Sequence, residues 1–131
     1  LGDQIELLGY DLSLPGQTSP NLEVTLYWQA LTEMATNYTS FVHVLDASGQ
    51  IAAQLDHVPG DGAFPTSGWL PGEVIADHFS LRVPAERGLT PESAQLELGL
   101  YDPATMVRLP RLDAAGQVVD TRILVSPAGN R

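Results

Sequence analysis

The sequence contains no cysteine, no lysine and no long hydrophobic run. The lack of cysteine excludes disulfides, thiolate nucleophiles and Cys-ligated metals. No window approaches the ~18 consecutive apolar residues of a membrane-spanning helix. All six basic residues are arginines, and they face sixteen acidic residues, which gives a formal charge of −10. This negative field repels a phosphate backbone, so we do not expect the chain to bind nucleic acid.

Helical periodicity is also scarce. Apolar and polar residues instead alternate in short segments, which are separated by Gly, Pro, Asp, Asn and Ser. In the clearest segment, Leu22, Val24, Leu26 and Trp28 point to one face, as in a strand with one side on a core. A single turn of helix is expected at Ala85–Ser93. We predict about eight strands, at Gln4–Leu14, Leu22–Leu31, Tyr38–Leu45, Gln50–Leu55, Val74–Val83, Gln95–Tyr101, Met106–Leu112 and Gln117–Val125.

Short antiparallel strands without covering helices favour an all-β fold, and we predict an antiparallel β-sandwich. The long segment Asp56–Glu73 lacks alternation and suits a crossover between two sheets. Such wiring is typical of a jelly-roll or an immunoglobulin-like Greek key. Residues 1–126 are predicted to form a single domain, and residues 127–131 a flexible tail.

The residues that usually carry catalysis form no recognisable constellation. His43, His57 and His78 match no zinc spacing, and His43 is interpreted as a hydrogen-bonded core or boundary residue. His57 and His78 each follow an aspartate, but neighbours in a strand point to opposite faces, so neither pair is a ready-made dyad. No serine lies in a nucleophile elbow. We therefore expect no enzymatic activity from this chain.

The segment from Asp56 to Asp77 combines rigid turns, acids and an aromatic residue, and it is the best candidate for a ligand site. One interpretation is a sugar platform, with Trp69 stacking on a pyranose and Asp61 or Glu73 accepting hydroxyl hydrogen bonds. A second is a calcium-stabilised loop, although no cofactor is predicted. The third is that Trp69 folds inward and plugs the sandwich. The candidate ligand-binding residues are Trp69, Asp61, Glu73, Asp56, Asp77 and Tyr101.

Several short motifs together resemble a known bacterial module. They are Leu7–Asp11, Leu26–Ala30, Tyr38–Asp46, Asp56–Thr66, Trp69, Pro71–Glu73, Asp77, Gly99–Pro103 and Arg108–Pro110. This set is similar to the extracytoplasmic C-terminal β-sandwich domain of multi-spanning membrane glycosyltransferases of the lipid-phosphate-sugar-dependent type, and of related uncharacterised membrane proteins. The resemblance covers nearly the whole chain.

The resemblance indicates where the domain is located and what protein it belongs to, but it indicates no mechanism for the domain itself. It places the domain on the extracytoplasmic side of a bacterial membrane, as part of a larger membrane protein whose membrane domain carries the transferase chemistry. The leading hypothesis is a non-catalytic accessory domain that binds glycan or contacts that membrane domain. The alternative is a purely structural or protein-interaction module without a ligand. Solvent exposure of Trp69 and Tyr101 distinguishes the two.

Overall fold

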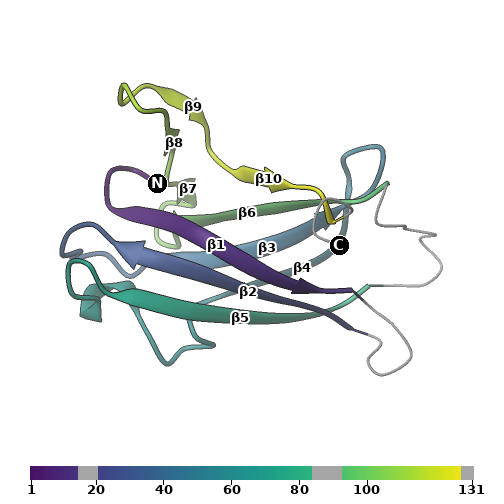
Figure 1. The fold of residues 1–131 in the computed structure, drawn as a ribbon, viewed down its shortest axis with the longest axis horizontal. Coiled ribbons are helices and arrows are strands. Elements are labelled where there is room, and N and C mark those ends of the chain that lie inside the picture. Colours follow the sequence, from purple (N-terminus) through teal and green to yellow (C-terminus); the bar gives the residue numbers. More distant parts are fainter. Residues whose placement is uncertain (15–20, 84–92, 128–131) are drawn as a thin grey trace.

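The chain forms an antiparallel β-sandwich in a computed structural model that describes residues 1–14, 21–83 and 93–127 (Figure 1). The first sheet has the order β1-β2-β5, and the second has the order β10-β6-β3-β4, with β7 also paired to β6. A separate two-stranded ribbon, β8-β9, stands off the second sheet. The strands are β1 (Ile5–Ser13), β2 (Asn21–Ala30), β3 (Thr39–Leu45), β4 (Ile51–His57), β5 (Val74–Arg82), β6 (Gln95–Asp102), β7 (Val107–Arg108), β8 (Arg111–Leu112), β9 (Val118–Asp120) and β10 (Ile123–Val125).

Two wirings of the sandwich were predicted, a jelly-roll and an immunoglobulin-like Greek key, and the strand order follows the second. In an immunoglobulin-like Greek key the chain crosses between sheets after its second strand, and later strands return to both sheets. Here β2 leads to β3, and β4 leads to β5, each time in the opposite sheet. The loop between β4 and β5 is the predicted crossover, and it contains one short 3-10 helix at Thr66–Gly68. None of the described residues lies in a helix that is long and apolar enough to span a membrane.

The core lies between the sheets because alternate side chains of each strand point inward. In β2 every second residue is buried, and Val24, Leu26 and Trp28 are fully enclosed. Leu96 and Leu98 of β6 meet them from the second sheet. These are positions that two-residue alternation predicts, because successive side chains of a strand point to opposite faces.

The last two predicted strands are each divided in the structure. Leu109 still donates its N–H to Leu100 O at 2.8 Å, but Pro110 has no N–H to continue the pairing, so β7 and β8 are separate strands. The second division falls between β9 and β10, where the chain returns to the sheet. One continuous strand over Gln117–Val125 would place Val119 on the same face as Ile123 and Val125, and this expectation was wrong: Val119 is exposed, because β9 belongs to the ribbon. The helical turn predicted at Ala85–Ser93 and the tail beyond Pro127 lie outside the described residues.

The outer face of the second sheet carries a compact polar network around one aromatic ring. Phe41 of β3 is fully buried although it points away from the core, because its ring lies over Gly99 of β6 and beneath the Arg108 guanidinium, 4.5 Å from the ring centroid. His43 follows on the same face and is a buried, hydrogen-bonded residue, with Nδ1 2.9 Å from Glu97 and Nε2 2.9 Å from Asp56.

Gly99→Ala is expected to destabilise the domain by about 1–3 kcal/mol, the usual cost of overpacking. A Cβ at position 99 would lie 2.7 Å from Phe41 Cζ, and the enclosed ring has little room to move. Urea unfolding measures the difference. Gly9→Ala is the matched control in β1, since a Cβ there meets nothing within 4 Å, and it should change stability by less than about 0.5 kcal/mol. Equal stability of the two variants would contradict this packing argument.

Candidate functional site

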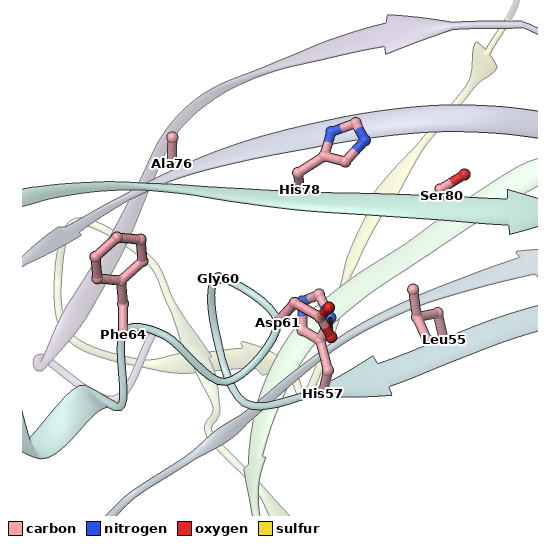
Figure 2. A pocket seen from close by; sticks show the side chains of 8 residues that line it. All are labelled: Leu55, His57, Gly60, Asp61, Phe64, Ala76, His78 and Ser80. Atoms are coloured by element: carbon pink, nitrogen blue, oxygen red, sulfur yellow. Dashed lines mark ion pairs between the residues drawn. The ribbon is translucent and has the colours of Figure 1, made fainter.

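An open hollow of about 440 Å³ lies where the β4–β5 loop passes the edge of the sandwich (Figure 2). Its volume falls in the range of small-ligand sites. Phe64, Asp61 and Gly60 approach from the loop, and His78 lies on β5. The full lining comprises Leu55, His57, Gly60, Asp61, Phe64, Ala76, His78 and Ser80.

The loop tip beside the hollow has an unusual backbone. Three consecutive residues have positive φ angles: Gly60 at 70°, Asp61 at 54° and Gly62 at 93°. Glycine adopts this region freely, and aspartate is among the few other residues that visit it often. The tip therefore turns sharply and presents the Asp61 side chain to solvent, with 95% of its surface exposed. Backbone held in sparsely populated regions concentrates at ligand-binding sites, which makes this carboxylate a functional candidate.

Phe64 supplies an aromatic surface on the same loop. Its side chain is half exposed, and its ring lies against Gly60 so closely that a Cβ at that position would come within 2.3 Å of the ring. Phe64 N also donates to Pro59 O at 3.0 Å, which fixes the backbone that carries the ring. The hollow thus combines a held aromatic ring with an exposed carboxylate.

A buried carboxylate anchors this loop to the core. Asp77 of β5 is fully enclosed, yet it accepts four hydrogen bonds: from Gly60 N at 2.9 Å, His57 Nε2 at 2.7 Å, Ser40 Oγ at 2.6 Å and Trp28 Nε1 at 3.1 Å. A buried carboxylate requires such partners, because an unpaired charge in the interior is very costly. The four donors come from the loop and from three different strands, so Asp77 fixes the loop tip relative to both sheets.

His57 links the buried anchor to the hollow. Its Nε2 bonds Asp77, its Nδ1 lies 3.9 Å from Asp61 Oδ1, and its ring stacks on Phe79 at 4.1 Å between centroids. On the opposite wall, His78 Nδ1 lies 3.0 Å from Thr25 Oγ1. As predicted, neither neighbouring Asp-His pair forms a dyad, because His57 bonds Asp77 of β5 and His78 lies against Thr25 of β2.

The six predicted ligand residues do not converge on one site. Asp61 lines the hollow, whereas Asp77 lies in the core. Glu73 accepts a hydrogen bond from Leu70 N at 2.9 Å and shapes a turn. Trp69 is 3% exposed and donates its Nε1–H to Phe64 O at 2.9 Å, so its ring faces are closed to a sugar. Trp69 is therefore the inward plug, and by the exposure criterion given above this burial argues against the predicted sugar platform on Trp69.

Asp56 and Tyr101 meet on the outer face of the second sheet. The Tyr101 hydroxyl donates to Asp56 Oδ2 at 2.9 Å, and Asp56 also bonds His43. Burial of the phenol, reinforced by the Asp56 hydrogen bond, raises the pKa of Tyr101. These two residues belong to the network around Phe41 and not to the hollow.

Sequence reasoning missed Phe64 and did not place the two histidines at the site. The available signal was the pattern Gly60-Asp61-Gly62 followed closely by an aromatic residue, which joins a sharp turn to an apolar surface. Among the described residues, no three His, Asp or Glu side chains gather as a metal site. Ser40 and His57 both bond Asp77, which occupies the place between them, so these three residues do not form a nucleophile–base pair.

The fold and this site define an antiparallel β-sandwich with an open hollow beside its crossover loop. No protein-family model matches the chain, and no curated protein is significantly similar to it in sequence.

Proposed function

We propose that this chain is a non-catalytic accessory domain that binds carbohydrate through the hollow beside the β4–β5 loop. One observation carries the proposal: an exposed carboxylate on a left-handed turn, Asp61, and a half-exposed ring, Phe64, line the same hollow. Sugar sites pair an aromatic surface for the C–H face with acceptors for the hydroxyl groups. His78 and Ser80 add polar groups on the opposite wall.

The wider setting is also a proposal, and it rests on the sequence resemblance. In this setting the domain lies on the extracytoplasmic side of a bacterial membrane, attached to the membrane domain of a glycosyltransferase-like protein. There it would hold a glycan near the transferase while contributing no reacting group of its own. Its acidic surface, with ten net negative charges, opposes binding to nucleic acid.

The test is a titration of the isotope-labelled domain with glucose, galactose, mannose and N-acetylglucosamine, followed by NMR. Binding should shift the amide signals of Gly60–Phe64 and of the facing part of β5. Phe64→Ala and Asp61→Asn should each weaken affinity about tenfold, as loss of a stacking contact or of a charged acceptor predicts. Val119→Ala, on the distant ribbon, serves as the control and should bind normally.

A protein-interaction module is the second candidate, and exposed aliphatic residues favour it. Leu31, Leu70 and Met106 are 47%, 65% and 68% exposed. The strand registers bring their loops to the same end of the sandwich. Large exposed apolar side chains in a group are typical of contact surfaces. If no saccharide shifts the hollow signals, carbohydrate binding is refuted and this second candidate takes its place.

A further inference from the structure

The outer face of the first sheet continues directly from the hollow. Ala76, His78 and Ser80 line the hollow from β5, and their side chains point to the sheet face that is away from the core. Across the ladder, Ala76 pairs with Tyr27 and His78 pairs with Thr25 of β2. Neighbouring strands lie about 4.8 Å apart, so Tyr27 is one strand spacing from the wall of the hollow.

Tyr27 is the aromatic residue at the middle of this face, and it is held in place. Its hydroxyl donates to Asp11 Oδ2 of β1 at 2.5 Å, across the adjoining strand pair. This hydrogen bond, followed by desolvation and the Asp11 charge, raises the pKa of the Tyr27 phenol. A ring fixed in this way loses little conformational entropy when a ligand packs on it.

Gly9 leaves open space next to that ring. It is the direct cross-strand partner of Tyr27, and a Cβ at position 9 would meet nothing within 4 Å. Its φ is not positive, so neither backbone conformation nor a close contact requires glycine there. Any larger side chain at this position would stand beside the Tyr27 ring, since cross-strand partners project from the same face.

We infer that the Tyr27 face is a second sugar subsite, and that the ligand of this domain is an oligosaccharide running from the hollow across β5 and β2 to β1. The inference rests on the proposed function. Polar groups that can bond hydroxyls border the whole path: Asp61 and His78 at the hollow, then Thr25, Tyr27 and Asp11. Two aromatic rings lie along the path, Phe64 at its start in the hollow and Tyr27 on the central strand β2.

The charge of this path selects neutral sugars. Asp11, Glu23 and Asp61 contribute three carboxylates. Among the described residues, this face has one arginine, Arg82 at the end of β5. The remainder of the molecule is also acidic. A uronic acid or a sulfated sugar would meet like charge along its length, which lowers its affinity relative to a neutral sugar of the same size.

The experiment compares chain lengths by calorimetry and NMR. The probes are glucose, mannose and N-acetylglucosamine, the tetrasaccharides cellotetraose, β-1,4-mannotetraose and tetra-N-acetylchitotetraose, and tetragalacturonic acid as the acidic member. The best neutral tetrasaccharide should bind about tenfold more tightly than its monosaccharide, because it gains the Tyr27 stack. It should also shift signals of Gly9 and Tyr27, which the monosaccharide leaves unchanged. Tetragalacturonic acid should bind more weakly than the neutral chains.

Two variants identify the subsite. Tyr27→Ala should remove the tenfold gain while leaving monosaccharide affinity unchanged, and Gly9→Val should do the same by crowding an intact Tyr27. Leu124→Ala, on the other sheet, is the control and should retain the gain. Equal affinity for short and long chains, or a gain that survives both variants, would overturn the second subsite and leave the hollow intact. Failure of every saccharide to bind would instead reject the proposed function itself.

Discussion

Asp77→Ala is expected to reduce the free energy of unfolding by about 3–5 kcal/mol, the range measured when one member of a buried charged pair is removed. The substitution leaves buried donors from His57, Ser40 and Trp28 without their acceptor, and each unsatisfied group carries its own desolvation cost. A loss of this size is a large share of the stability of an ordinary domain. Urea unfolding followed by tryptophan fluorescence is the measurement.

The conservative variant Asp77→Asn covers the case in which the alanine variant does not fold. Asparagine retains the shape and one acceptor oxygen, but its NH₂ group must face at least one donor. We therefore expect a smaller loss, about 2 kcal/mol. Glu33→Gln neutralises an exposed carboxylate and should change stability by less than about 0.5 kcal/mol. If Asp77→Asn behaves like Glu33→Gln, Asp77 does not anchor the loop.

Glu97→Gln is expected to cost about 3 kcal/mol at neutral pH, because it breaks a nearly buried charge cluster. The Glu97 carboxylate is 5% exposed and receives hydrogen bonds from Arg122 at 2.7 Å, His43 at 2.9 Å and Arg108 at 3.3 Å. Glutamine keeps one acceptor oxygen but carries no charge, so Arg108 and Arg122 are left close together without the carboxylate that neutralises them. Asp120, 3.7 Å from Arg122, compensates for only part of the loss, since it is more exposed.

The same residue predicts how stability depends on pH. Burial raises the pKa of Glu97, but the hydrogen bonds from Arg122 and His43 and the charge of Arg108 lower it by more, so the pKa lies below its ordinary value of 4.5. The unfolded chain then binds the proton more tightly than the folded chain does. The stabilisation is complete above pH 4.5 and is lost as the pH falls through the folded-state pKa.

Urea unfolding from neutral to acidic pH tests this dependence. The stability difference between the wild-type domain and Glu97→Gln should be greatest at neutral pH and should shrink as the solution becomes more acidic than pH 4.5. Glu33→Gln, compared at neutral pH, is the control for removing one exposed carboxylate. A difference that stays constant across the titration would mean that Glu97 acts through its shape alone.

The fold class could be predicted from local patterns because strand alternation is a local property. The inward positions of β2 and β6, the hairpin of β3 with β4 and the crossover loop between β4 and β5 all follow from side-chain period and turn chemistry. The interruption at Pro110 could be predicted as well, because proline cannot donate to a strand ladder. The division after Asp120 was missed, since an alternating segment looks the same whether it lies in a sheet or in a free ribbon.

The candidate site depended on tertiary structure to a much greater degree. The sequence by itself determined that an acidic, cysteine-free chain would form a two-layer sandwich with an acid-rich crossover loop carrying Asp61. Only the tertiary structure decided that Trp69 turns inward, that Phe64 is the open aromatic ring, and that Asp77 binds the loop to both sheets. The physical reason is that alternation specifies which face of its own strand a side chain occupies. Alternation does not specify partners that are distant in sequence. The hydrogen-bond partners of Asp77 lie 17 to 49 residues away from it, and sheet register and the path of the crossover bring them together.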